Sequence, residues 1–132
     1  MKIDGGIGGL DTAAASAAAL EGRGYDGVMA AETSHDPFLP LLLAAQSTER
    51  VDLMTSIAVA FARSPMTLAQ TAWDLQSASG GRFVLGLGSQ IRPHITRRFS
   101  MPWSHPAARM REMIQAIRAI WASWNDGSKL DF

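Results

Sequence analysis

Two side chains with acid–base chemistry, Glu32 and His35, follow closely on an apolar run of residues, 27–31. An imidazole titrates near neutral pH, so His35 could pass a proton or stabilise a developing charge. A lone histidine in a loop is more often solvated than catalytic, and a carboxylate after a strand also occurs in dinucleotide-binding sites. Glu32 and His35 are therefore candidate catalytic residues whose surroundings decide their role.

A second group of polar side chains follows the apolar run 82–87. His94, Arg97 and Arg98 lie in the same loop, and guanidinium groups bind phosphate or carboxylate oxygens through paired N–H donors. The loop could therefore bind the phosphate of a cofactor or an anionic substrate. A solvated basic loop explains the same residues equally well.

Charge and cysteine content narrow the classes of function. The 132 residues carry 12 lysines and arginines and 12 acidic residues, so no net charge attracts nucleic acid or an anionic membrane. The absence of cysteine excludes disulfides, thiolate metal sites and a cysteine nucleophile. No apolar run approaches the roughly 18 residues of a membrane span. We therefore expect a cytoplasmic protein that binds no metal, nucleic acid or membrane.

Short apolar runs alternate with helix-forming stretches along the whole chain, at a spacing of roughly 25 to 30 residues. The expected strands are residues 1–7, 27–31, 51–59 and 82–87. The expected helices are residues 12–23, residues 38–46, a helix from Ser64-Pro65 to Gly80-Gly81, and residues 107–124.

Residue types near the helix ends predict their boundaries. Asp11 is placed to cap the free N–H groups of the first helix, and Gly24 is placed to end it. Ser64 precedes a proline at the first position of the third helix. The buried side of the last helix is expected to consist of seven apolar residues, namely Met110, Met113, Ile114, Ile117, Ile120, Trp121 and Trp124.

Apolar strands that alternate with helices predict an α/β fold with parallel strands. Two arrangements fit: an open doubly wound sheet, or part of a (β/α)8 barrel, whose eight units normally take about 250 residues. The glycines at positions 5–9 match the dinucleotide-binding pattern only in part, with Glu32 as its acid. Glycines at strand ends are common for turn reasons alone, so this match supports a dinucleotide site only weakly, and the periodicity by itself leaves both arrangements open.

The segment from Asp74 to Ser89 carries a family resemblance. From Leu75 to Gly88 it runs Leu-Gln-Ser-Ala-Ser-Gly-Gly-Arg-Phe-Val-Leu-Gly-Leu-Gly. It is similar to the Leu-Asp-x-Leu-Ser-x-Gly-Arg-x-x-Leu-Gly-x-Gly pattern of the luciferase-like monooxygenase superfamily. Other matching pieces occur in the same order: residues 21–27, 55–58, 63–65 with Ala69, and Pro106 with 109–112. The run from Arg92 to Phe99 is most similar to the branch that uses the deazaflavin coenzyme F420.

This resemblance implies a partial TIM barrel, a (β/α)8 fold with about four parallel βα units, in which residues 1–132 form the N-terminal half. Chemistry in such barrels occurs at the carboxyl ends of the strands. In this chain those ends are expected at Gly5-Gly6, Ala31–Thr33, Ser56–Val59 and Gly88-Ser89.

The resemblance also assigns residues to the cofactor. The family has a non-proline cis peptide behind the flavin ring, and Ser56-Ile57 is the matching pair. Gly86 and Gly88 match positions where the ring approaches the backbone, and Ser89 could donate to the ring or its ribityl chain. The alternatives are an ordinary trans peptide and glycines that merely fit a crowded strand.

Polar residues of the site follow from the same comparison. An acid and a histidine near the ring correspond to Glu32 and His35. His94, in the loop after the fourth strand, is a candidate cofactor-binding residue through the cofactor's phosphate. Sugar-phosphate dehydrogenases of the family continue after the strand with glycine and a catalytic acid. This chain has Gln90 and Ile91 there, so we do not expect a sugar phosphate as its substrate.

The expected function is hydride transfer with coenzyme F420 to or from a small-molecule substrate, or else FMN-dependent monooxygenation. The alternative is a non-catalytic half-barrel that serves as an assembly or interaction module. Four strands in a row leave the first and fourth with unpaired edges. We therefore expect either a homo-oligomer or a missing C-terminal half of the barrel.

Overall fold

Four parallel strands pair in the order in which they occur along the chain. The computed structural model describes residues 1–132, and its main sheet has the order β1 (Asp4–Gly6), β2 (Gly27–Ala30), β3 (Asp52–Thr55), β5 (Phe83–Val84). A doubly wound sheet changes direction at a switch point, whereas a barrel adds each strand beside the previous one. The order confirms an arc of a (β/α)8 barrel and rules out the dinucleotide-binding arrangement.

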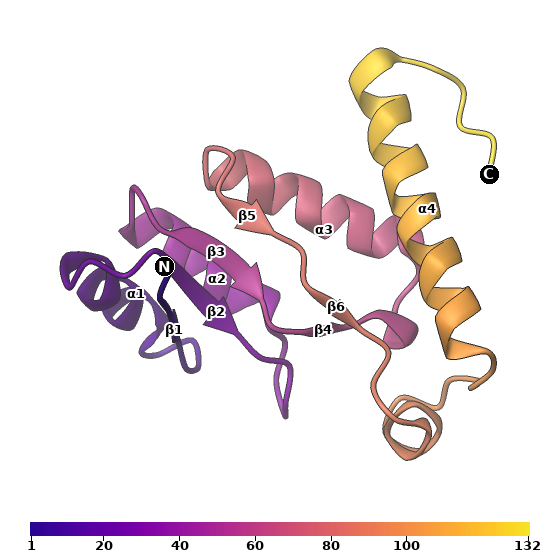
Figure 1. Cartoon of the computed structure of the whole chain (residues 1–132), viewed down its shortest axis with the longest axis horizontal. Coiled ribbons are helices and arrows are strands. Elements are labelled where there is room, and N and C mark those ends of the chain that lie inside the picture. The colour runs from indigo at the N-terminus through magenta and orange to yellow at the C-terminus, as the bar shows by residue number, and fades with distance from the viewer. The chain divides into compact units, whose positions relative to one another are not determined.

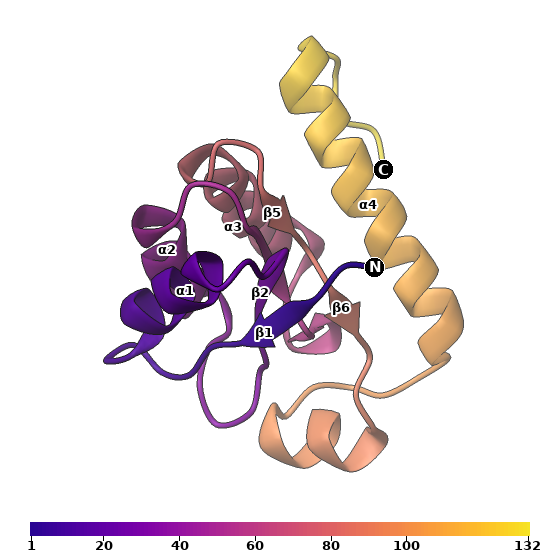
Figure 2. The ribbon, with the colours of Figure 1, turned by 60° about the vertical axis from the view of Figure 1, so that its left-hand side comes forward.

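The register of the strands gives the sheet two different faces. Val28, Leu53 and Phe83 are in register and buried. The ring of Phe83 lies 6.5 Å from the ring of Phe38 at the start of α2 (Phe38–Ser47). Figure 2 shows α2 beside α1 (Ala13–Gly22) along this sheet. This face is therefore the one that the helices cover, as in a barrel.

The next residues along the strands point to the opposite face. Met29, Met54 and Val84 are in register, and none of them is buried; Val84 is 48% exposed. In a closed barrel this face points inward, where opposing strands cover it. The chain by itself leaves this face of the sheet uncovered.

The first helix starts without the expected aspartate cap. Thr12 is its N-cap residue and makes no side-chain cap hydrogen bond, so the prediction for Asp11 is wrong. The N–H groups of Thr12 and Ala13 donate to the carbonyl of Gly9 instead, at 3.2 and 3.0 Å. A backbone turn thus satisfies the groups that a cap would serve. At the other end Gly24 has a φ of 85°, which confirms it as the terminating residue.

The predicted third and fourth strands are each interrupted. Residues 51–59 form β3 and, after a break at Ser56-Ile57, the two-residue β4 (Ala58–Val59). Residues 82–87 likewise form β5 and, two residues later, β6 (Leu87–Gly88). β4 and β6 pair in a separate two-stranded sheet. The apolar pattern predicted the extended runs but could not show where the pairing changes.

Internal contacts divide the chain into two units. The first consists of Met1–Ala58 and Asp74–Leu87, and the second of Val59–Trp73 and Gly88–Phe132. The second contains the single turn η1 (Ala60–Ala62), most of α3 (Pro65–Ala78), the π-helical turn η2 (His94–Arg98) and α4 (Pro106–Asp126). We expected an irregular loop where η2 lies.

Aromatic side chains hold the helices of the second unit together. The indole N–H of Trp121 donates to the carbonyl of Ala69 at 3.0 Å, and the ring of Trp124 meets that of Trp73 edge-on at 5.5 Å. The buried residues of α4 are Met113, Ala116, Ile117 and Ile120. Trp124 is 40% exposed, so its assignment to the buried side is wrong, since one edge-on partner covers only part of a large indole.

The helix starts in the second unit agree better with the sequence. The N–H of Thr67 donates to the hydroxyl of Ser64 at 3.2 Å, which confirms the predicted cap of α3.

Across the whole chain, no helix combines the length and the apolar character that a membrane span needs.

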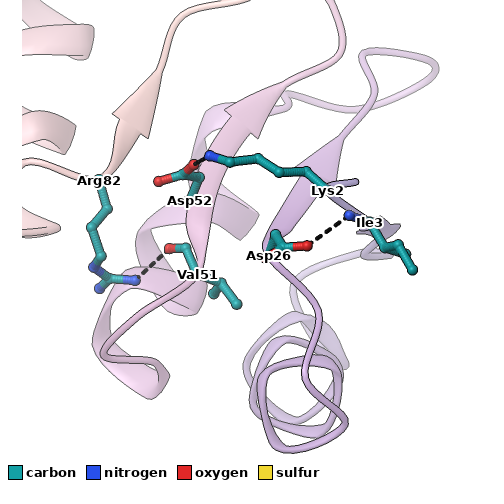
Figure 3. Close-up of polar contacts among 6 residues, drawn as sticks. All are labelled: Lys2, Ile3, Asp26, Val51, Asp52 and Arg82. Carbon is teal, nitrogen blue, oxygen red and sulfur yellow. Dashed lines mark hydrogen bonds and ion pairs between the residues drawn. The ribbon is translucent and has the colours of Figure 1, made fainter.

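Polar contacts fasten the amino ends of the strands in the first unit. The Nζ of Lys2 lies 3.3 Å from the carboxylate of Asp52, and the N–H of Ile3 donates to the carboxylate of Asp26 at 2.8 Å (Figure 3). These contacts join the segment before β1 to the starts of β2 and β3, at the end of the sheet away from the candidate site.

Arg82 fastens the same end of the sheet to α2. Its five N–H groups make five hydrogen bonds, four of them to carbonyl oxygens, including that of Val51 at 2.8 Å (Figure 3). The carbonyls of Ala45 and Thr48 lie at or just after the end of α2, where helix carbonyls lack intrahelical partners. The arginine of the Gly-Arg pattern is therefore a structural residue.

Glu21 plays the complementary role for backbone N–H groups. Its carboxylate accepts hydrogen bonds from Glu49, Arg50 and Val51 at 2.7 to 3.1 Å. Burial by itself raises the pKa of Glu21, but these three donors, helped by the charge of Arg50, outweigh it and hold the pKa below its usual value. The carboxylate thereby fixes the turn that leads into β3.

We predict that Glu21→Gln lowers stability near neutral pH and weakens its pH dependence. A depressed pKa stabilises the fold above the unfolded value near 4.5, and that contribution is lost as the pH falls through the lowered folded value. Urea unfolding should show a loss of about 1 to 2 kcal/mol at pH 7 that shrinks toward zero in acid.

Glu112→Gln is the control, because Glu112 is exposed on α4 and should change stability by less than about 0.5 kcal/mol. If the free energy of unfolding of wild type and of Glu21→Gln changed with pH in parallel, the role given to this carboxylate would be contradicted.

Candidate functional site

The carboxyl ends of the first three strands are joined by backbone hydrogen bonds. The N–H of Ile7 donates to the carbonyl of Met29 at 2.9 Å, and that of Ser56 donates to Ala30 at 2.8 Å. The N–H of Glu32 donates to the carbonyl of Ile57 at 3.3 Å. The structure therefore brings Glu32 next to the Ser56-Ile57 peptide, as expected for strands that share one end.

The Ser56-Ile57 peptide bond is cis, which confirms the geometry that the family resemblance implied. Ser56 is exposed and Ile57 is half-buried. Their contact with a cofactor remains a prediction.

His35 lines a pocket in the first unit. The pocket has a volume of about 570 Å³, within the range of small-molecule sites. Its other lining residues are Gly9, Leu10, Asp11, Asp36, Leu39 and Pro40. Glu32 is buried, with 9% of its surface exposed, and is not among the lining residues. The two predicted catalytic residues therefore do not share this pocket.

Asp36 is a site residue that the sequence analysis missed. Its carboxylate accepts hydrogen bonds from the N–H groups of Phe38 and Leu39 at 2.8 and 3.0 Å, so it caps α2 from one residue before the N-cap position. Capping holds in place the loop that carries His35. The Asp-Pro-Phe sequence at a helix start was the available signal.

The chemistry of the pocket suits part of a flavin-like molecule. Leu10, Leu39 and Pro40 offer apolar walls to a flat ring, and His35 adds a group that donates or accepts a hydrogen bond. The carboxylates of Asp11 and Asp36 disfavour a phosphate group there, because like charges repel. The pocket therefore fits the ring of such a cofactor better than its phosphate.

Gly86 lacks room for a side chain because of a contact inside the fold. A Cβ built on Gly86 would collide with the carbonyl oxygen of Thr55. The hydroxyl of Thr55 also donates to the Gly86 carbonyl at 2.8 Å and accepts from its N–H at 2.9 Å. The contact with β3 therefore requires a residue without a side chain at position 86. This agrees with the alternative explanation, in which the glycine is needed to fit a crowded strand. Whether a cofactor also approaches Gly86 stays a prediction.

Thr55 belongs to the piece, residues 55–58, that is similar to the family. It is 2% exposed, and a buried hydroxyl in an otherwise apolar strand needs a hydrogen-bond partner. That requirement was a usable signal, but the sequence could not show that the partner is Gly86.

Gly88, Ser89 and His94 belong to the second unit. The hydroxyl of Ser89 donates to the carbonyl of Gln90 at 3.2 Å. The Nδ1 of His94 lies 3.1 Å from the side-chain oxygen of Gln90. Gln90 itself has a φ of 58°, a left-handed conformation that glycine adopts without strain. The side chain of Gln90 thus contacts His94 from a left-handed backbone position.

No group of three or more histidine, aspartate or glutamate side chains is placed to hold a metal ion.

Comparisons with known proteins agree with this geometry. A family model described as luciferase-like monooxygenase matches residues 2–132. The uncharacterized protein Rv1360 of Mycobacterium tuberculosis is 62% identical over 133 residues, which are 100% of this chain and 39% of that protein. Rv3520c of the same organism, whose name assigns it to the coenzyme F420-dependent oxidoreductases, is 39% identical over 106 residues, 80% of this chain and 30% of that protein. The chain spans about two fifths or less of these relatives.

Solved structures show the same fold. The coenzyme F420-dependent tetrahydromethanopterin reductase of Methanopyrus kandleri matches with a TM-score of 0.82 at 18% identity, over 99% of this chain and 42% of that chain. The oxygenating constituent of 3,6-diketocamphane monooxygenase from Pseudomonas putida, solved with FMN, matches with a TM-score of 0.80 at 18% identity, over 92% and 40%. At this level of identity the likeness shows the fold alone.

We predict that Gly86→Ala destabilises the chain by about 3 kcal/mol, because the added methyl group meets a backbone carbonyl that cannot move aside. Urea unfolding without any ligand measures the loss. The control is Gly22→Ala at the end of α1, where a Cβ meets nothing within 4 Å, and stability should stay level or rise by up to about 1 kcal/mol. If Gly86→Ala kept wild-type stability, the contact with Thr55 would not explain the glycine, and only the proposed approach of a cofactor would remain as its reason.

Proposed function

The chain belongs to the luciferase-like monooxygenase family, and we propose that it is the N-terminal half of an oxidoreductase barrel that uses coenzyme F420. Such a deazaflavin supplies hydride transfer to or from a substrate held against its ring. The observation that carries the proposal is the pocket at His35, at the end of the sheet where the Ser56-Ile57 peptide is cis.

Coenzyme F420 is preferred over FMN because of the relatives. Rv3520c, whose name carries coenzyme F420, is 39% identical to this chain, whereas the FMN-containing neighbour is 18% identical. FMN-dependent monooxygenation is therefore the second form of the same proposal.

Each residue has a limited part in this proposal. His35 would hold or move a proton at its ring nitrogens, since its imidazole lines the pocket. Glu32 is buried beside Ile57, so we assign it to positioning that peptide and the loop leading to His35. Contacts to the cofactor are proposed for Ser56, Ile57, Gly86, Gly88, Ser89 and His94.

A non-catalytic half-barrel is the second candidate function. The observation in its favour is the uncovered face of the sheet at Met29, Met54 and Val84, together with the unpaired edges of β1 and β5. An unpaired strand edge and an apolar face both favour association with another polypeptide. In this case the chain would serve assembly rather than catalysis. A cytoplasmic location is part of both proposals.

The partner that we propose is a second copy of the chain or the C-terminal half of the barrel. All four strands are parallel and occur in chain order, so β5 of one half can pair with β1 of another in the same direction. Two such halves make eight strands, the number that closes a TIM barrel.

Titration with oxidised coenzyme F420 and, separately, with FMN tests the cofactor assignment through fluorescence. We expect binding of coenzyme F420 that Leu39→Glu weakens by about tenfold or more, because the new charge enters an apolar wall of the pocket. The control is Leu42→Glu, on the same helix outside the pocket, which should change affinity less than about twofold. Preferential binding of FMN would favour FMN-dependent monooxygenation instead. If the chain bound neither cofactor, the result would favour the non-catalytic half-barrel.

Sedimentation of the isolated chain tests the partner assignment. We expect a dimer or larger species that Val84→Lys shifts toward monomer, because a lysine on an edge strand opposes pairing. Leu42→Lys, a charge added on α2, should leave the distribution unchanged. A clean monomer whose sheet binds no hydrophobic dye would rule out association through this face.

A further inference from the structure

The zero net charge of the chain conceals a strong separation of charge. The second unit contains eight lysines and arginines against three acidic residues, a net charge of +5, and the first contains four against nine, a net charge of −5. No acidic residue occurs between Asp74 and Glu112. The absence of a net charge therefore does not exclude an anionic ligand from the second unit.

Three of these eight basic residues are grouped at one turn. Arg97 and Arg98 lie in η2, the unlabelled salmon-coloured coil at the bottom of Figure 2, and Arg92 lies two residues before it; all three side chains are exposed. The turn is anchored by Ile95, which is 0% exposed, and by hydrogen bonds from Ile95 N–H to Ile91 and from Met101 N–H to Ile95. A fixed backbone lowers the entropy that a ligand must overcome to gather the arginines.

These guanidinium groups have no anionic partner in the protein. No ion pair and no hydrogen bond to protein involves the side chain of Arg92, Arg97 or Arg98. Arg98 stacks on the ring of Phe99, with its Cζ 4.9 Å from the ring centroid. Fifteen N–H donors in three forks are thus available to oxyanions.

His94 completes the group. It lies between Arg92 and Arg97 in the chain, and its Nδ1 contact with Gln90, 3.1 Å from the side-chain oxygen, orients the ring. Gln90 reaches this position through its left-handed backbone. The imidazole therefore has one nitrogen engaged and one left for a ligand.

We propose that the η2 turn binds a small molecule with several phosphate or carboxylate groups, through Arg92, Arg97 and Arg98. Seven residues span about 10 Å at most, which matches a few clustered oxyanions better than a nucleic-acid strand. The nearest aromatic ring, that of Phe99, is already stacked on Arg98, so it offers no free platform for bases. The proposal can be tested apart from the redox assignment, because none of the three arginines is a proposed cofactor contact and none lines the pocket at His35.

Calorimetric titration of the chain with sodium tripolyphosphate, and separately with citrate, tests the proposal at low salt. We expect saturable binding of at least one probe, weakened by about tenfold or more in the triple variant Arg92→Gln, Arg97→Gln, Arg98→Gln. The matched control is Arg111→Gln, Arg118→Gln, Lys129→Gln, which removes the same charge from exposed residues of the same unit and should weaken binding less than about twofold.

Far-UV circular dichroism checks that both triple variants keep their helices, and the three single substitutions replace the first triple if it does not. The preferred probe distinguishes a phosphate ligand from a carboxylate ligand. If both triple variants lost the same affinity for the probe, binding would reflect the overall positive charge of the unit, and the proposed site would be overturned. Failure of the chain to bind either probe would overturn it as well. Tighter binding of a short single-stranded oligonucleotide, lost in the same variant, would overturn the assignment to a small anion.

Discussion

The contact between Gly86 and the carbonyl of Thr55 is the constraint on which the rest of the first unit depends. No side chain fits between these two backbones, and the hydroxyl of Thr55 bonds both the N–H and the carbonyl of Gly86. The N–H of Ala58 donates to the same carbonyl at 2.8 Å. The cis peptide at Ser56-Ile57 therefore lies between two residues that are fixed to one point of the neighbouring segment.

Two charged side chains do comparable work for the loops at the other end of the sheet. Glu21 gathers backbone N–H groups that precede β3, while Arg82 gathers carbonyls around the end of α2. Each replaces hydrogen bonds that regular secondary structure would otherwise provide. The Gly-Arg pattern that reveals the family is thus explained in this chain by folding, and the candidate chemistry lies elsewhere.

The two units differ in the charge of their candidate binding residues. The pocket of the first unit has apolar walls, one histidine and two carboxylates, in a unit with a net negative charge. The segment from Arg92 to Arg98 in the second unit presents three arginines and no carboxylate.

The sequence alone determined the class of fold, since alternating apolar runs and helix signals require parallel βα units, and short-range signals such as Ser64-Pro65 and Gly24 act through neighbouring backbone. The motif matches also predicted the family and the cis peptide. Only the tertiary structure decided that His35 and not Glu32 lines the pocket, that Gly86 is excluded from carrying a side chain by Thr55, and that Arg82 caps α2. These outcomes depend on residues that lie about 24 to 37 positions apart in the chain, and periodicity carries no information about such pairs because loop geometry sets their approach.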